Sequence, residues 1–170
     1  GSQQEPLQNR ASSIAQGVDG IVTTITNPTI FDAAVDEALA AGIPVITANT
    51  DDPEGAAGSN RLAYVGQDLE AAGYELAATL SKQFPDGPVH VLIGVADMNQ
   101  SWAYTRANGI ARFMDDYKAA NPDREVTYEK IESGMDLSTV GNRVASYVQT
   151  NPNTTACLLY TSPSPRDSSP

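Results

Sequence analysis

Residues 20–49 read GIVTTITNPTIFDAAVDEALAAGIPVITAN and predict a strand, a helix and a second strand. The runs GIVTTIT and PVITAN are short and rich in β-branched residues, which is typical of strands. Between them Asn27 can cap a helix and Pro28 suits its first turn, whereas Gly42 and Pro44 end it. One apolar stripe lies at helical spacing within this segment: Phe31, Ala34, Val35, Ala38 and Leu39. The stretch therefore predicts a βαβ unit with two parallel strands.

The same alternation of strands and helices continues along the chain. Further strands are predicted at 62–66, 89–94 and 125–131, and further helices from Asp68 onward, at 101–119 and at 138–150. Regular alternation of this kind is typical of an α/β fold with a mostly parallel sheet and helices on both of its faces.

Composition excludes some partners. The 170 residues carry 21 acidic and 10 basic side chains, a net charge of -11, which repels nucleic acid and anionic membranes. No apolar run approaches the roughly 20 residues of a membrane-spanning helix, and the first residues lack the apolar core of a secretion signal. We therefore expect no nucleic-acid partner.

Both ends of the chain differ from a complete domain. Residues 6–17 predict a helix with no strand before it, and the chain stops where a strand should follow the last helix. Residues 157–167, CLLYTSPSPRD, match the translation, in one reading frame, of a transposase sequencing adapter. The alternative interpretation of this stretch is a native, disordered Ser/Pro-rich terminus. We expect a piece of a longer protein, with residues 157–170 as a non-native, disordered tail that contains the single cysteine, Cys157.

The residues offer little for catalysis. Neither GxGxxG nor GxxxxGK[ST] occurs, so the usual anchors of nucleotide cofactors are absent from the sequence. His90 is the only histidine and alternates with apolar neighbours, which favours a structural role in a strand. Adjacent acids such as Asp51 and Asp52 are interpreted as solvated loop residues. We predict no enzyme activity, no cofactor and no metal site.

Polar side chains follow several of the predicted strands, at the edge where parallel sheets bind ligands. Thr24 follows the first strand and Asn49 and Asp51 the second, and a third group follows residues 89–94: Asn99, Trp102 and Arg106. Amide, carboxylate and guanidinium groups make paired hydrogen bonds to neighbouring hydroxyls, and an aromatic ring packs on the apolar face of a sugar. The pattern favours a site for a hydroxyl-rich ligand. The alternative is that Trp102 is core, Arg106 a surface cation and the rest turn residues.

Four motifs carry a family resemblance: QGVDGI, AAGIPVI, LAYVGQD and the R-x-x-G of TRANGI. Over residues 6–156 the chain resembles the periplasmic sugar-binding proteins of the ribose/galactose-binding type, which have the type I fold and serve ABC importers. The resemblance implies a non-enzymatic, periplasmic, monomeric receptor that holds a monosaccharide or related polyol between two α/β lobes and delivers it to a membrane permease.

The resemblance also implies lobes and ligand contacts. Residues 1–60 correspond to part of the first lobe, 61–67 to a hinge crossing and 68–156 to part of the second lobe. Matched to ligand-contact positions of the family are Thr24, Asn49, Trp102, Arg106 and, near the place of a ring-packing aromatic, Met135. Asn49 replaces a usual aspartate and Thr50 a frequent arginine, so the identity of the sugar stays open.

Two other classes of protein compete with this interpretation. The effector domain of a lactose-repressor-like regulator uses the same fold to sense a sugar, and its DNA contacts would lie in a separate helix-turn-helix. A small flavodoxin-like enzyme would need a phosphate-binding turn at a strand end, and the sequence has none. Upstream sequence separates the first two classes, because a signal region indicates a receptor and a basic helix-turn-helix indicates a regulator.

Overall fold

The computed structural model of the chain describes residues 16–159, so the helix predicted at 6–17 lies almost wholly outside the described residues. These residues form two compact units. The first runs up to Gln67 and includes Gln100–Trp102, and the second comprises Asp68–Asn99 and the chain from Ala103 onward.

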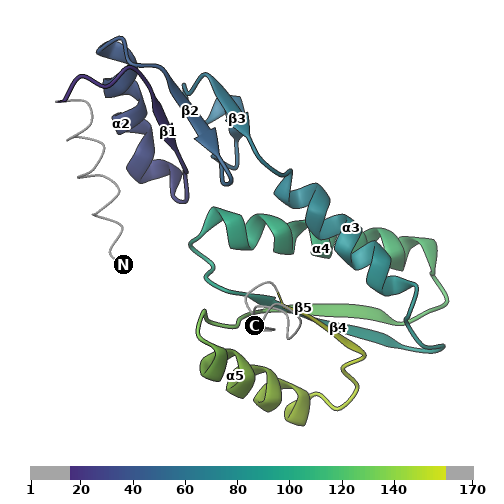
Figure 1. Ribbon diagram of the computed structural model, residues 1–170. Coiled ribbons are helices and arrows are strands. Elements are labelled where there is room, and N and C mark those ends of the chain that lie inside the picture. Colours follow the sequence, from purple (N-terminus) through teal and green to yellow (C-terminus); the bar gives the residue numbers. More distant parts are fainter. Residues whose placement is uncertain (1–15, 160–170) are drawn as a thin grey trace, which may run out of the picture. The chain divides into compact units, whose positions relative to one another are not determined.

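The first unit contains the predicted βαβ repeat (Figure 1). Its elements are β1 (Ile21–Thr23), α2 (Pro28–Ala40), β2 (Val45–Ala48), a short 3-10 helix (Gly55–Ala57) and β3 (Ala63–Val65). The strands pair in the order β1-β2-β3, and both pairings are parallel. Pro28 occupies the first turn of α2 as expected, but the Asn27 side chain makes no capping hydrogen bond.

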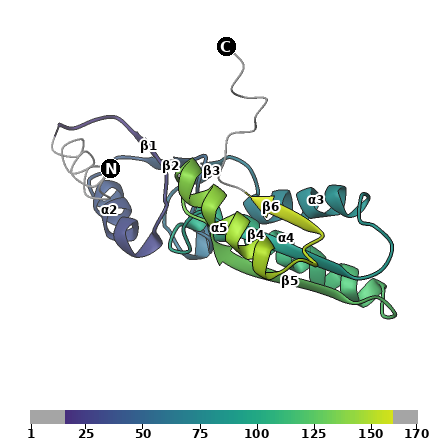
Figure 2. The ribbon, with the colours of Figure 1, turned by 90° about the horizontal axis from the view of Figure 1, so that it is seen from below.

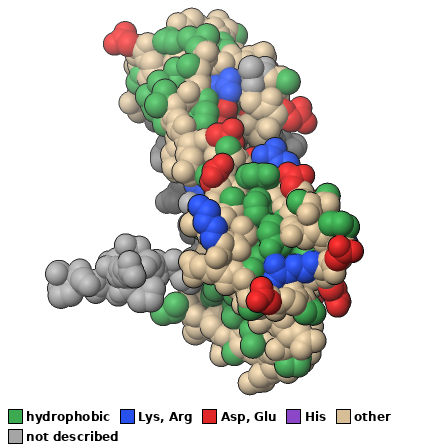
Figure 3. Space-filling view, turned by 90° about the vertical axis from the view of Figure 1, so that its right-hand side faces the viewer, with side chains coloured by type: hydrophobic (Ala, Val, Ile, Leu, Met, Phe, Trp, Pro, Cys, Tyr) green, Lys and Arg blue, Asp and Glu red, His purple; other side chains and the backbone are tan. Residues whose placement is uncertain are grey.

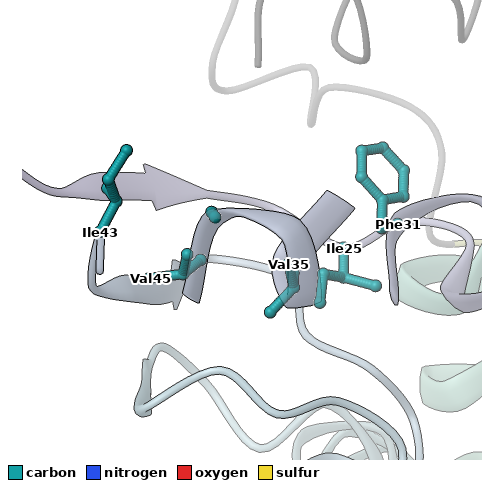
Figure 4. Packing of buried hydrophobic residues seen from close by; sticks show 6 residues of the cluster. Ile25, Phe31, Val35, Ile43 and Val45 are labelled. Atoms are coloured by element: carbon teal, nitrogen blue, oxygen red, sulfur yellow. The ribbon is translucent and has the colours of Figure 1, made fainter. Parts of the chain in front are cut away.

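The core of the first unit lies between α2 and the sheet (Figure 4). Its buried members are Ile25, Phe31, Val35, Ala38, Ile43 and Val45. Three of them come from the stripe that the helical spacing predicts, and the others come from the segments that flank α2 and from β2. Burying each large apolar side chain contributes about 1.5–3 kcal/mol, so this contact holds the βαβ unit together.

The second unit is a three-layer α/β arrangement. Its elements are α3 (Leu69–Ser81), β4 (Val89–Val95), α4 (Ser101–Ala120, whose first two residues belong to the first unit), β5 (Val126–Glu132), α5 (Leu137–Thr150) and β6 (Ala156–Leu159). The order β5-β4-β6 is parallel throughout, with β4 in the centre and almost completely buried. Helices α3 and α4 lie on one side of the sheet and α5 on the other (Figures 1 and 2). The predicted α/β fold class is confirmed.

Helices α3 and α4 touch through two glycines. A Cβ atom on Gly73 would lie 2.0 Å from the carbonyl oxygen of Arg106, and one on Gly109 would lie 1.9 Å from the carbonyl oxygen of Glu70. Each glycine therefore admits the backbone of the opposite helix, and this contact sets where the second turn of α4 lies.

The last strand corrects the prediction of disorder from Cys157 onward. Residues 157–159 belong to β6, where Cys157, Leu158 and Leu159 pair with Leu92, Ile93 and Gly94. Leu158 is buried. Three consecutive apolar residues gain a hydrogen-bonded ladder and burial beside β4, and this outweighs the Ser/Pro composition that follows them. Residues 160–170 lie outside the described range.

On the face shown in Figure 3, basic side chains form separate groups with acidic ones among them. Within residues 16–159, no helix has the length and apolar character needed to cross a membrane.

Candidate functional site

The carboxyl ends of β1 and β2 are tied together in the first unit. The backbone N–H of Ile25 donates to the carbonyl of Thr50 at 3.0 Å. Ser101, which is buried, donates from its N–H to the Thr26 carbonyl at 3.2 Å and from its hydroxyl to the Ile25 carbonyl at 3.3 Å. These bonds bring three predicted site residues into one neighbourhood: Thr24, Asn49 and Trp102.

The three residues differ in exposure and backbone geometry. Thr24 and Asn49 are exposed, and Trp102 is half-buried. Asn49 has φ 67°, and it is the only non-glycine residue in the described part of the chain with a positive φ. Asparagine tolerates this left-handed conformation better than most residues. The Asn49 N–H donates to the Val65 carbonyl at 3.1 Å, and the Tyr64 hydroxyl donates to the Asn49 carbonyl at 3.0 Å. The backbone of Asn49 is thus anchored at the strand end.

Asp51, another predicted ligand contact, is engaged by the protein itself. Its carboxylate accepts from the Thr47 hydroxyl at 2.6 Å and from Arg61 Nε at 2.9 and 3.2 Å, and Arg61 Nη2 makes a further contact. The side chains of Arg61 and Asp51 are only 8% and 11% exposed. Burial by itself raises the pKa of Asp51, but the hydrogen bonds from Arg61 and Thr47 outweigh it and hold the pKa below its usual value. The ion pair fixes the loop between β2 and β3.

The interpretation of Asp51 and Asp52 as solvated acids is therefore wrong. Asp52 is 4% exposed, and its Oδ1 accepts from the backbone N–H of Glu54 at 2.7 Å. Sequence reasoning also missed Arg61 as the partner of Asp51. A signal was present, since Arg61 is the only Lys or Arg between Arg10 and Lys82, in a segment that carries many acids.

The second unit has its own strand ends, where β4 and β5 stop side by side. The N–H of Ser133 donates to the Val95 carbonyl at 2.7 Å. Asn99 follows β4, and both its backbone N–H and its side-chain amide donate to Asp97 Oδ1, at 2.8 and 3.2 Å. Met135 follows β5 and is 66% exposed. Two predicted residues, Asn99 and Met135, thus lie at adjacent strand ends.

Exposed apolar side chains accompany Met135. Leu137, at the start of α5, is 74% exposed, and Met98, after β4, is 39% exposed. Neither residue was predicted as part of the site. In the sequence, each of them is an apolar residue that follows a predicted strand and falls outside the apolar stripe of the next helix. This pattern could have identified them. Together with Met135 they offer apolar surface beside the polar group of Asn99.

Arg106 lies in the second turn of α4 and is half-buried. Its backbone carbonyl is the group that faces Gly73 of α3. Trp102 precedes it by one helical turn, as predicted. The structure nevertheless groups Trp102 with the first unit and Arg106 with the second, because Ser101 is bound to the end of β1. The predicted lobe ranges placed both residues together.

His90 lies near the opposite end of β4 and belongs to a separate polar cluster under α5. Its Nδ1 lies 2.8 Å from the Thr127 hydroxyl, its Nε2 lies 2.7 Å from the Tyr147 hydroxyl, and that hydroxyl donates to Glu129 at 2.7 Å. Burial, and then the Glu129 carboxylate, raise the pKa of Tyr147 to about 12. A cavity of about 580 Å³ lies beside His90 and Thr127. Each nitrogen of the ring has a protein partner, which agrees with a structural role.

Metal chemistry has no support from the residues that the structure describes. Within residues 16–159, no group of three or more His, Cys, Asp and Glu side chains is placed to hold a metal ion. The candidate ligand contacts are therefore described for each unit by itself: Thr24, Asn49 and Trp102 in the first, and Asn99 and Met135 in the second.

Comparison with known proteins gives consistent matches. The family described as periplasmic binding protein domain matches residues 2–164. The xylose/arabinose-binding protein XylF of Sulfolobus acidocaldarius is 28% identical over 153 residues, which is 86% of this chain and 36% of that protein.

Two solved structures are similar as well. A periplasmic sugar-binding protein of an ABC sugar transporter from Legionella pneumophila is 26% identical, with a TM-score of 0.80 over 92% of this chain and 54% of that one. A carbohydrate transporter from Acidothermus cellulolyticus, solved with myo-inositol, is 26% identical, with a TM-score of 0.73 over 91% and 50%. The chain thus spans about a third of the length of XylF and about half of these solved chains.

Proposed function

Since this chain belongs to the periplasmic binding protein domain family, we propose that the complete protein binds a monosaccharide or related polyol and delivers it to an ABC permease. It acts as an extracytoplasmic, monomeric receptor and not as an enzyme. Support comes from the relatives, because one is named for binding xylose and arabinose and another was solved with myo-inositol. The position of the ligand between two lobes stays a prediction.

The observation that carries this proposal is that the segments with Thr24, Asn49 and Trp102 are joined by hydrogen bonds. The Ile25 N–H donates to the Thr50 carbonyl, and Ser101 donates to the carbonyls of Ile25 and Thr26. The amide of Asn49 can both donate to and accept from neighbouring hydroxyls, and the indole of Trp102 offers a flat apolar face. A sugar presents both kinds of surface. The exposed side chains of Met98 and Met135 beside Asn99 offer the same combination in the second unit.

Arg106 supplies a charged donor to the proposed ligand set. Hydrogen bonds to charged groups contribute about 1.5–3 kcal/mol, so a guanidinium that contacts sugar hydroxyls accounts for about 10- to 150-fold in affinity. Asp51 stands apart from the other predicted contacts, because Arg61 and Thr47 already occupy its carboxylate. Its part in binding is to hold the loop that follows Asn49.

The test is calorimetric titration of the complete protein with pentoses, hexoses and inositol. Arg106→Ala and Trp102→Ala are each expected to weaken binding at least tenfold. Arg112→Ala is the matched control, because it removes the same charge from the same helix and breaks the exposed pair with Glu70 at 2.7 Å together with the contact of the guanidinium with the Tyr74 ring. Unchanged affinity in both the Arg106 and Trp102 variants would remove these residues from the site, and no binding of any polyol would refute the proposed function.

A further inference from the structure

Tyr64 links two backbone segments of the first unit. The residue lies in the middle of β3 and is half-buried. Its hydroxyl lies 3.0 Å from the carbonyl oxygen of Asn49 and 2.9 Å from the carbonyl oxygen of Gln67. One segment is the exit of β2, and the other is the end of the stretch that leaves the first unit. A phenol has one hydrogen to donate, so the two carbonyls share it.

The ring of Tyr64 packs against the backbone of Gly66. A Cβ atom at Gly66 would lie 2.2 Å from the Tyr64 hydroxyl oxygen and 2.5 Å from the ring carbon that carries it. Any residue other than glycine at this position would displace the ring. The ring therefore rests directly on the backbone of residue 66, and the hydroxyl is held where the two carbonyls converge.

The residue that Tyr64 contacts is the one with the unusual backbone. Asn49 has φ 67°, a conformation that asparagine tolerates better than most residues but that still costs free energy unless neighbouring groups hold it. Three hydrogen bonds hold it here: the Asn49 N–H donates to the Val65 carbonyl, the Thr50 N–H donates to the Ala48 carbonyl at 2.7 Å across Asn49, and the Tyr64 hydroxyl donates to the Asn49 carbonyl. The first two join backbone groups, so only the third depends on a side chain.

We propose that Tyr64 is a positioning residue that holds Asn49 in its left-handed conformation and so presents the Asn49 amide at the strand end. The benefit to ligand binding rests on the proposed function, because it requires Asn49 to contact the sugar. The same hydroxyl couples the position of Asn49 to that of Gln67. A shift of the Gln67 carbonyl therefore alters the hydrogen bond that the same hydroxyl makes to the Asn49 carbonyl.

Hydrogen exchange of the complete protein tests the positioning role without any ligand. Tyr64→Phe removes one oxygen and leaves the ring, and it is expected to speed exchange of the Asn49 amide about fivefold to tenfold. The Ile43 amide, which donates to the Ala38 carbonyl at 2.9 Å in the same unit, serves as the internal reference and is expected to stay unchanged. Tyr74→Phe is the matched control, since it breaks one phenol bond, to Asp116 at 3.0 Å, in the second unit.

Three results of the exchange experiment would overturn the positioning role of Tyr64. Equal exchange of the Asn49 amide in Tyr64→Phe and wild type overturns the proposal, as does equal acceleration of Asn49 and Ile43, which indicates a general loss of stability. If Tyr64→Phe yields little folded protein, Asn49→Gly is expected to restore it, because glycine adopts φ 67° without strain. Failure of that rescue also overturns the proposal.

A sugar titration then connects the positioning role to binding. Tyr64→Phe is expected to weaken affinity about fivefold, and Asn49→Ala to weaken it further. The double variant should bind no more weakly than Asn49→Ala, because Tyr64 acts only through Asn49. Additive losses in the double variant overturn the coupling. If wild-type protein binds no polyol, the proposed function fails, and the exchange experiment still decides the role of Tyr64.

Discussion

Replacing Arg61 with methionine is expected to destabilise the first unit strongly. The guanidinium makes two Nε contacts with Asp51, at 2.9 and 3.2 Å, and a further one from Nη2, and both side chains are about nine-tenths buried. Methionine fills similar space but leaves the Asp51 carboxylate buried with only the Thr47 hydroxyl as side-chain donor. Removing one partner of a buried pair costs about 3–5 kcal/mol.

Urea unfolding followed by tryptophan fluorescence measures this loss. Trp102 is the only tryptophan of the chain and belongs to the first unit, so its signal reports on the unit that contains Arg61. With an m-value of about 1.5 kcal/mol/M, a loss of 3 kcal/mol lowers the urea midpoint by about 2 M.

The matched control is Arg112→Met, because the Arg112 pair with Glu70 has a similar contact distance but side chains that are 54% and 44% exposed. Exposed pairs contribute about 0–1 kcal/mol, so this variant should lose little stability of the second unit. Because that unit lacks tryptophan within the described residues, its unfolding is followed by circular dichroism. If Arg61→Met lowers the free energy of unfolding no more than Arg112→Met does, burial does not determine how much an ion pair contributes to stability, and the reasoning is refuted.

Three further results are expected from urea unfolding followed by circular dichroism. Gly73→Ala should lower the free energy of unfolding by about 1–3 kcal/mol, since the new methyl group meets a backbone carbonyl of α4. Gly141 has nothing within 4 Å of an added Cβ atom, so Gly141→Ala should stabilise α5 by about 0.5–1 kcal/mol. Equal effects of the two substitutions would contradict the close contact between α3 and α4. Burial, and then Asp52, raise the pKa of Asp32, so the stability that Asp32 contributes below the usual carboxyl pKa is lost as the pH rises through its raised value. Asp32→Asn should therefore gain stability relative to wild type between about pH 4 and neutral pH, and a constant difference would argue against this. Hydrogen bonds from Thr139, and then Ser138, lower the pKa of Asp136 to about 2, so its contribution is present above the usual carboxyl pKa and lost as the pH falls from about 4 to 2. Asp136→Ala should flatten the stability profile in that range, and an unchanged profile would exclude the capping role.

Much of the fold could be predicted because its signals are local. The apolar stripe of α2, its proline start and the β-branched runs on either side act within a few residues of one another, and the structure has a βαβ unit at that place. The cap of α3 is equally local, and Asp68 accepts from the Ala71 N–H at 2.9 Å as expected. The candidate site could be predicted only as positions along the chain, since strand ends can be located in a sequence.

The sequence by itself determined the α/β alternation, the helix starts and the polar residues that follow each strand, because propensity, periodicity and capping depend on near neighbours. Tertiary structure alone decided which of these residues are available to a ligand. Asp51 and Arg61 lie ten positions apart and meet across the loop between them, the Tyr64 hydroxyl contacts the Asn49 carbonyl, and β6 forms because β4 offers it an edge. Contacts of this kind depend on chain folding that brings distant residues together, and no local pattern encodes their distances.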